Sequence, residues 1–277
     1  MFRPRNSDVN AADRVLATEN RWRPRGLRWH GSRVVVDRFG ENVAAEYDSD
    51  ETGMFSPAVL GPAVEFLAEL AGADAALELG IGTGRVALPL SARGVPVHGI
   101  DLSEAMLARL RAKPGSERIG VTAGDFARTG APGEFGLVYL VFNTINNLTT
   151  QDEQVDCFGN AARHLVPGGH FVIEVGVPDL QRLPFGETHV PFEFGADHVG
   201  VDEYDVAGQG LISHHFWKRD GRWNLDSMPF RYVWPAELDL MARLTGMRLV
   251  QRWADWARSP FTSTSRRHVS VWRKEEE

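Results

Sequence analysis

Residues 75–101 constrain the fold more than any other stretch of this chain. They read as a short apolar run, a turn with glycine at every second position from Gly80 to Gly84, a helical segment, and a second apolar run that ends at Asp101. A short apolar run of this kind is typical of a parallel strand covered on both faces. Glycine permits dihedral angles closed to other residues and lets the backbone approach a ligand closely. The stretch therefore predicts a β-α-β unit, and with it an α/β fold.

The same turn is suited to a ligand that carries a nucleoside. The helix after Gly84 would direct its free N–H groups and the positive end of its dipole at a carboxylate or phosphate. Asp101 lies 21 residues after Gly80, where a carboxylate at a strand end can accept hydrogen bonds from two ribose hydroxyls. The dinucleotide fingerprint requires glycine or alanine where this chain has Arg85, and the bulk of arginine would crowd a pyrophosphate. The pattern thus departs from a dinucleotide site.

Five landmarks resemble the motifs of the class I S-adenosylmethionine-dependent methyltransferases, in that family's order and spacing. They are Glu-Leu-Gly-Ile-Gly-Thr-Gly-Arg at 78–85, Asp-Leu-Ser-Glu-Ala-Met-Leu at 101–107, Val-Thr-Ala-Gly-Asp-Phe at 121–126, the strand-like run 135–142 followed by Asn143, and Leu-Val-Pro-Gly-Gly at 165–169. The resemblance covers residues 45–182 well and the C-terminal part more loosely.

This resemblance implies S-adenosylmethionine as the cofactor and S-adenosylhomocysteine as the product. The glycine turn would hold the amino-acid tail, Asp101 the ribose, and Asp125 the adenine amino group, with Phe126 beside the ring. Glu78 would help to bind the cofactor's amino group, and an ordinary helix-facing or exposed charge is the alternative. Arg85 stays open between the cofactor carboxylate and the helix surface. The implied cofactor-binding residues are Tyr47, Glu78, Gly80, Gly82, Gly84, Asp101, Leu102, Asp125, Phe126 and Phe142.

The resemblance also implies a doubly wound, Rossmann-like α/β fold with a seven-stranded sheet whose last strand runs antiparallel. Short strand-like runs between glycine or aspartate turns, with a hairpin turn at Asp220-Gly221, predict an antiparallel β insert over the active site. The expected parts are an N-terminal lead-in at 1–40, a cofactor-binding core with a cap at 41–182, the insert at 183–233, and the C-terminal completion of the core sheet at 234–277.

Prolines mark the starts of two helices. Ser56-Pro57 and Gly61-Pro62 are alternative starts for the first one, because proline is tolerated in a first turn but not deep inside a helix. Pro235 begins the second helix, whose inward face is expected to carry Leu238, Met241 and Leu244.

Composition agrees with an enzyme of ordinary globular character. A chain of 277 residues with 43% hydrophobic content can bury a full core, and its net charge of −7 argues against a broad nucleic-acid-binding surface. The single cysteine, Cys157, excludes a disulfide framework within the chain and reads as a packed core thiol. Because no apolar run has the length of a membrane span and no signal core begins the sequence, we expect a cytoplasmic enzyme without a membrane partner.

The lead-in is rich in arginine. Residues 1–40 contain nine arginines, no lysine and four acids. One interpretation is an arm for an anionic partner, and the other is a lead-in or strap that contacts a protein partner. Arginine outnumbers lysine 27 to 3 in the whole chain, so the absence of lysine means little and we favour the second interpretation.

Three residues are candidates for catalysis: Tyr47, His214 and His215. In-line methyl transfer requires a positioned nucleophile, and a base where the nucleophile carries a proton. Tyr47 precedes the first core helix, where related enzymes carry a similar tyrosine, and a packed aromatic is an equally good interpretation. Alternation along the predicted strand directs His214 and His215 to opposite faces, and a hydrogen-bonded structural role is the alternative for each. Adjacent histidines on a strand cannot readily share one metal, so we predict no metal site.

The predicted activity is methyl transfer to a small-molecule acceptor, as N- or O-methylation and as natural-product tailoring. The layout resembles amino-sugar N,N-dimethyltransferases and glycine N-methyltransferases. A nicotinamide-dependent oxidoreductase and a non-catalytic S-adenosylmethionine-binding regulator are the alternatives. The segment 142–144 lacks the Asn-Pro-Pro-aromatic motif of enzymes that methylate nucleobase amines, which argues against a nucleic-acid partner. The oligomeric state stays open, although an exposed insert edge could pair two copies as a homodimer.

Overall fold

The computed structural model describes residues 37, 39–41, 44, 47–48 and 56–276. All nine arginines of the predicted lead-in lie outside the described residues, as do residues 49–55 of the predicted cap.

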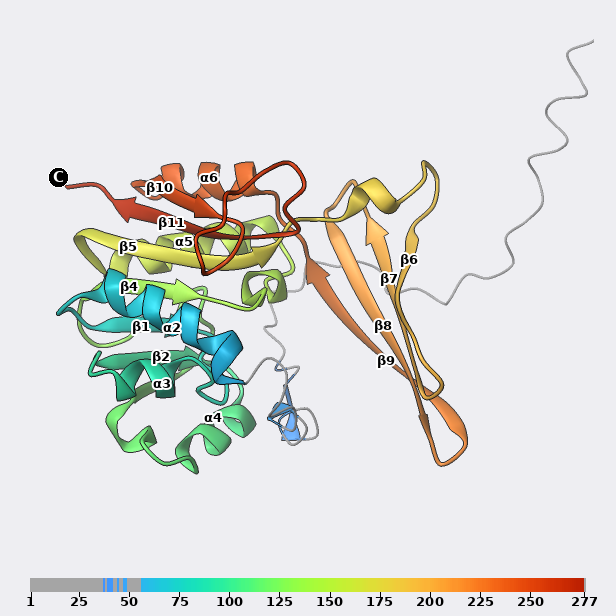
Figure 1. Ribbon diagram of the computed structural model, residues 1–277, viewed down its shortest axis with the longest axis horizontal. Helices are drawn as coiled ribbons and strands as arrows, with labels where there is room; N and C mark the ends of the chain where they lie inside the picture. The colour runs from blue at the N-terminus through green and yellow to red at the C-terminus, as the bar shows by residue number, and fades with distance from the viewer. Residues whose placement is uncertain (1–36, 38, 42–43, 45–46, 49–55, 277) are drawn as a thin grey trace, which may run out of the picture. The chain divides into compact units, whose positions relative to one another are not determined.

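A seven-stranded sheet forms the core, in the order β10-β11-β5-β4-β1-β2-β3 (Figure 1). β1, β2, β3, β4 and β5 run parallel, and β11 lies antiparallel between β10 and β5. The strands are β1 (Ala76–Leu79), β2 (Val97–Asp101), β3 (Gly120–Ala123), β4 (Phe135–Leu140), β5 (Leu165–Gly176), β10 (Met247–Trp253) and β11 (Arg267–Lys274). The predicted seven-stranded sheet with an antiparallel last strand is therefore confirmed.

Helices cover both faces of this sheet. Side chains of α2, α3 and α4 pack in the apolar cluster on one face, and those of α5 and α6 pack in the cluster on the other. The helices are α2 (Pro57–Ala71), α3 (Ala87–Ala92), α4 (Glu104–Arg111), α5 (Gln151–His164) and α6 (Pro235–Leu244), with 3-10 turns η2 (Ser116–Arg118), η3 (Thr144–Asn147) and η4 (Leu180–Arg182). The chain is thus doubly wound, and its loops at the carboxyl ends of the parallel strands form one edge.

The structure decides where α2 begins and corrects the predicted inward face of α6. α2 uses the earlier of its two alternative starts, so Pro62 lies inside it, next to a first turn that is largely exposed and can bond water instead. In α6, Leu238 and Met241 are buried as predicted, but Leu244 is 74% exposed. Three-residue steps drift around a helix, so the position six residues after Leu238 has left the buried face, and Ala242 takes that place.

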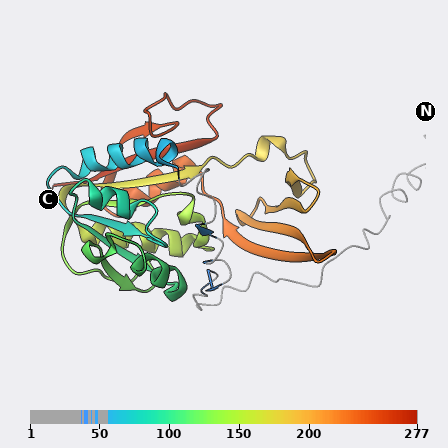
Figure 2. The same ribbon diagram turned by 60° about the horizontal axis from the view of Figure 1, so that its bottom comes forward.

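The insert is a second sheet of four antiparallel strands, in the order β6-β7-β8-β9 (Figure 1). Figure 2 shows its last two strands, in orange, as a long hairpin. The strands are β6 (His189–Phe194), β7 (His198–Asp205), β8 (Gly210–Arg219) and β9 (Arg222–Arg231). Asp220 and Gly221 both have positive φ, 52° and 73°, which confirms the tight hairpin turn between β8 and β9.

A buried hydrogen-bond junction ties the second sheet to the core. The side-chain amide of Gln154 donates to the carbonyls of Ile145, Leu148 and Arg231, at 3.2–3.3 Å. The Arg231 guanidinium donates in turn to the Gln154 side chain and, at 2.7 Å, to Glu237. Because Ile145 lies in η3, directly after β4, the end of β9 lies at the carboxyl edge of the core sheet.

Candidate active site

The glycine turn after β1 leaves open space against its backbone. Gly82 has φ +53°, and a Cβ built there would meet only the Met106 methyl, at 3.8 Å. Gly84 has φ +80°, and a Cβ there would collide with Leu110 of α4. The turn therefore requires glycine at Gly84 for packing against α4, whereas at Gly82 the lack of a side chain keeps room for a ligand.

Asp101, at the tip of β2, is fixed by the same turn. Its carboxylate accepts hydrogen bonds from the backbone N–H of Gly82 at 2.7 Å and of Ser103 at 2.9 Å, and the Leu102 N–H also contributes. Burial raises the pKa of Asp101, and these backbone donors oppose that rise. Each carboxylate oxygen has a second lone pair, so the group can still accept from ligand hydroxyls.

Glu78 is a buried carboxyl group in the middle of the parallel sheet. The residue is 3% exposed, and the Tyr139 hydroxyl of neighbouring β4 donates to its carboxyl group at 3.0 Å. Burial raises the pKa of Glu78 to about 8, and the bond from Tyr139 and the charge of Arg85 only partly oppose the rise. The alternative of an exposed charge is therefore wrong. At neutral pH Glu78 keeps its proton until a cation lies beside it.

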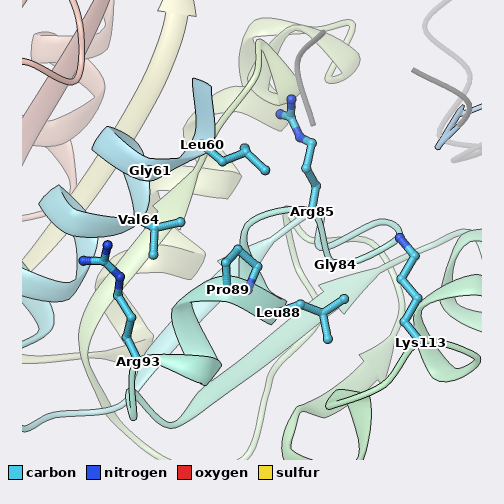
Figure 3. A pocket seen from close by; sticks show the side chains of 9 residues that line it. All are labelled: Leu60, Gly61, Val64, Gly84, Arg85, Leu88, Pro89, Arg93 and Lys113. Atoms are coloured by element: carbon cyan, nitrogen blue, oxygen red, sulfur yellow. The ribbon is translucent and has the colours of Figure 1, made fainter. Parts of the chain in front are cut away.

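Arg85 lies before α3, not on the surface of that helix. Its guanidinium lies 4.1 Å from the centre of the Phe142 ring, and its charge acts on both Glu78 and Tyr47. Arg85 and Gly84 line a cavity of about 450 Å³ between α2 and α3, and Figure 3 shows Arg85 among the side chains that line it. The alternative of a helix-surface arginine is therefore wrong, and a contact with the cofactor carboxylate stays a prediction.

The tip of β4 holds two strained residues in a row. Phe142 and Asn143 both have φ +58°, in the left-handed region that side chains other than glycine rarely adopt. Their N–H groups donate to the Glu174 side chain at 3.1 Å and to the Glu174 carbonyl at 3.2 Å. The Asn143 amide oxygen accepts from the Gly176 N–H at 2.7 Å. Each such residue costs about 1–3 kcal/mol and is typical of functional sites.

Asp125 and Phe126 lie at the tip of β3, beside the glycine turn. Asp125 accepts from the Ala127 N–H at 2.9 Å. The Phe126 ring is half-buried, and a Cβ on Gly80 would lie 3.8 Å from it and 2.6 Å from the Thr144 methyl. Gly80 thus allows β1, β3 and η3 to approach one another, and the predicted adenine-binding pair lies on that side of the turn.

The described part of the cap is attached to the glycine turn. Thr83 donates to the Asp48 carboxylate at 2.7 Å, and Lys113 pairs with Asp48 at 2.8 Å while donating to the Thr83 carbonyl at 2.8 Å. Burial raises the pKa of the adjacent Tyr47, and the charge of Arg85 opposes that rise. Tyr47 therefore lies within reach of the charges of Glu78, Arg85 and Asp101, and its catalytic role stays a prediction.

The two adjacent histidines lie on opposite faces of the second sheet, as alternation predicted. His214 contacts Ser227 Oγ at 2.8 Å and Glu203 Oε2 at 3.2 Å. His215 shares its face with Ser213 and contacts it at 3.3 Å. Among the contacts of the described residues, none brings either histidine to Glu78 or Asp101. Both stay candidates only.

Tyr139 was not among the predicted site residues, whereas Asn143 was named only as the end of a family landmark. Tyr139 stands inside an apolar run, where a tyrosine reads as ordinary core, and only the pairing of β4 with β1 reveals its partner.

Cys157 is buried as predicted, and burial raises its pKa. Within the described ranges no three His, Cys, Asp or Glu side chains are grouped to hold a metal ion. In the same part of the chain, no helix has the length and apolar character needed to cross a membrane.

Comparisons with known proteins agree with this geometry. A family described as a methyltransferase domain matches residues 76–169. The solved structure of the CcbJ methyltransferase from Streptomyces caelestis is 40% identical, covers 86% of this chain and 98% of its own, and has a TM-score of 0.75. The cypemycin N-terminal methyltransferase of a Streptomyces species is 28% identical over 200 residues, which are 70% of this chain and 81% of that protein.

A more distant structure shows the same fold. It is CalS10 with bound S-adenosylmethionine, an amino pentose methyltransferase from Micromonospora echinaspora involved in calicheamicin biosynthesis. It is 20% identical, covers 88% of this chain and all of its own, and has a TM-score of 0.62. The glycine turn, the acids at the tips of β1 and β2, and the 40% identity to CcbJ lead to one conclusion. The chain belongs to the S-adenosylmethionine-dependent methyltransferases.

Proposed function

We propose that this methyltransferase methylates an amine nitrogen of a small natural product. The relatives support the product class, since one is named for cypemycin and one for calicheamicin biosynthesis. They also support nitrogen as the acceptor atom, since one acts on an N-terminus and the other on an amino pentose. The nicotinamide-dependent alternative has no support among these matches.

The acidity of the second sheet is the main reason to propose an amine as the methyl acceptor. Residues 183–233 contain eight Asp or Glu and four Lys or Arg. Three of the four bases lie at 218–222, at the far hairpin, and the fourth, Arg231, is paired with Glu237 at 2.7 Å. The end of the sheet nearest the core is therefore left with uncompensated acids, which attract a cationic amine rather than a carboxylate or phosphate.

Aromatic rings lie at the same end. The rings of Tyr204 and Tyr232 are 5.8 Å apart, and Trp234 meets Tyr232 edge-on at 6.4 Å. The Tyr232 hydroxyl is buried without a hydrogen-bond partner among the described residues, and so is the amide oxygen of Asn146 in η3. Apolar rings with a few unpaired polar atoms are what a small-molecule pocket offers. We assign the acceptor to this region.

The cofactor fits the residues at the carboxyl edge. When bound, S-adenosylmethionine supplies a methyl group made electrophilic by a sulfonium. In our proposal Glu78 takes up its ammonium, Asp101 its ribose, and Asp125 with Phe126 its adenine. Tyr47, Leu102 and Phe142 complete the set. The open space beside Gly82 and the protonated state of Glu78 both suit a ligand that brings a cation to this place.

The chain must also help the acceptor to lose a proton. An amine is protonated near neutral pH and has no free lone pair until that proton leaves. Tyr47, His214 and His215 are the proposed candidates for this step. A cytoplasmic location and a homodimer paired through the second sheet stay predictions.

The test measures S-adenosylhomocysteine release from the full chain with a fixed panel. It contains an amino pentose, an alanine-initiated peptide, a phenol and a carboxylic acid of similar size. We expect turnover with an amine only. Turnover with the phenol alone would overturn the choice of nitrogen. Tight binding of S-adenosylhomocysteine without turnover of any compound would favour the regulator.

A further inference from the structure

We propose that one face of the second sheet is a proton relay, formed by Asp202, Ser213, His215, His198 and Glu193, that carries the proton of the acceptor amine to solvent. The inference rests on the proposed function, because it presupposes an acceptor that arrives protonated.

Strand pairing places the five side chains on one face. Asp202 of β7 lies directly opposite Ser213 of β8, and His215 lies opposite Gly200. His198 begins β7 and lies opposite Trp217. Residues two apart on a strand share a face, so Ser213 and His215 on β8 stand beside Asp202 and His198 on β7.

From Ser213 to Glu193, each neighbour in the series is within hydrogen-bond distance of the next. Asp202 lies directly opposite Ser213 in the pairing of β7 with β8 and interacts with it, and the Ser213 Oγ lies 3.3 Å from His215 Nε2. His215 Nδ1 lies 3.0 Å from His198 Nε2, and His198 Nδ1 lies 3.1 Å from Glu193 Oε2. The two imidazole rings are tilted by only 6°, with centroids 5.2 Å apart. This separation is typical of rings joined edge to edge, so the bond lies in the ring planes, as proton transfer requires.

The series runs from the interior to solvent. Ser213 is 8% exposed and Asp202 is half-buried. The His198 side chain is 11% exposed, and that of Glu193 is 54% exposed. Asp202 is the end of the relay nearer the core. Tyr204 lies two residues further along β7 and packs on Tyr232, which directly follows the core-side end of β9. The buried end of the relay therefore faces the region assigned to the acceptor.

The proton count of the series allows transfer. The acceptor ammonium gives its proton to the Asp202 carboxylate, and Asp202 gives a proton to Ser213 Oγ. The Ser213 hydroxyl proton moves to His215 Nε2, the His215 Nδ1 proton to His198 Nε2, and the His198 Nδ1 proton to Glu193 and then water. Each group breaks one bond to hydrogen and forms one, so the net change is one proton moved to solvent. The neutral amine keeps its lone pair for attack on the methyl carbon.

Aromatic rings fix the two imidazoles. The Trp217 ring stacks on His198 with centroids 3.7 Å apart and a tilt of 11°, and can stabilise a transient imidazolium. Phe192 meets His215 edge-on at 5.4 Å. A Cβ at Gly200 would collide with the Phe192 ring, so glycine opposite His215 makes room for that ring. Burial, and then the charge of His198, lowers the pKa of His215.

Other charged groups around the pair are accounted for. Asp226 of β9 lies opposite His215 and stabilises its charged form, as Glu193 does. Asp197, next to His198, is 4.0 Å from Lys218. On the other face, His214 is bonded to Glu203. Among the described contacts, none of these five groups replaces a bond of the relay.

The test compares pH–rate profiles of the full chain with the amino pentose and the alanine-initiated peptide. The variants are His198→Gln and Asp202→Asn, and His189→Gln is the control, an exposed histidine of the same sheet. Below the pKa of the free amine, we expect both relay variants to lose about 100-fold in kcat. Above that pKa they regain the wild-type rate, because the amine has lost its proton already. The control and the affinity for S-adenosylhomocysteine stay unchanged.

The possible results distinguish a failure of the relay from a failure of the proposed function. A loss that is equal at every pH would mean a structural role and would overturn the relay. Wild type that turns over neither amine would overturn the proposed function instead. Where the wild type turns over neither amine, the imidazole nitrogen resonances of the full chain decide on the coupled pair. Joint protonation of His198 and His215, with a midpoint that Glu193→Gln moves to lower pH, supports it. Independent titration, unaffected by Glu193→Gln, overturns it.

Discussion

Replacing Glu78 by glutamine tests the most perturbed acid of the candidate site. Burial raises the pKa of Glu78 from 4.5 to about 8, so the folded protein binds this proton more tightly than the unfolded chain does. The stability linked to the proton is complete below pH 4.5 and is lost as the pH rises towards 8. At 1.36 kcal/mol per pH unit the loss is about 3 kcal/mol at pH 7 and nearly complete at pH 8.

Glutamine has a similar shape and no charge at any pH. We therefore expect Glu78→Gln to raise the free energy of unfolding of the cofactor-free protein by about 3 kcal/mol at pH 7, and by little at pH 4.5. Urea denaturation at several pH values measures this difference. Lower stability of Glu78→Gln at pH 8 would refute the reasoning, because it would mean that the folded protein already favours the carboxylate.

The same substitution should weaken binding of S-adenosylhomocysteine. In the wild type the ligand's ammonium ionises Glu78, so binding releases a proton and the affinity rises about tenfold per pH unit until pH 8. Glu78→Gln should bind more weakly at pH 8 and without this slope. Calorimetry in two buffers of different ionisation enthalpy counts the released proton. Tyr139→Phe is the matched control: it keeps the ring, removes the donor to Glu78, and should move the wild-type slope to higher pH.

Three further variants test the rest of the site. Asp101→Ala removes the proposed ribose acceptor and the partner of the Gly82 N–H, and calorimetry should show much weaker S-adenosylhomocysteine binding; unchanged affinity would defeat the assignment. Gly84→Ala forces a Cβ against Leu110 at φ +80° and should lower the free energy of unfolding by about 1–3 kcal/mol in urea. Lys113→Met releases Asp48 and Thr83 and should raise KM for S-adenosylmethionine more than it lowers kcat, whereas an equal effect on both would count against a role in holding the cap.

Local patterns in the sequence were sufficient for most of the fold. The glycine turn, the acid at Asp101 and the hairpin at Asp220-Gly221 each depend on residues close together in the chain, and each is in its predicted place. The capping box at the start of α5 is equally local, since the Thr150 hydroxyl accepts from the Glu153 N–H three residues along the chain, at 3.2 Å. Leu244 was misplaced because a pattern of apolar spacing says little about where the buried face ends.

The contacts of the site could not be predicted from local sequence, because they join residues that are far apart in the chain. Glu78 and Tyr139 meet across 61 residues, and only the order of strands in the sheet makes them neighbours. His198 and His215 meet across 17 residues, and a shift of one residue in the pairing of β7 with β8 would turn them to opposite faces. Alternation alone predicted that His214 and His215 lie on opposite faces of the strand, but it gave His215 no partner. The chemistry of such a pair therefore depends on the register between β7 and β8. That register is determined by both strands together and cannot be read from one strand alone.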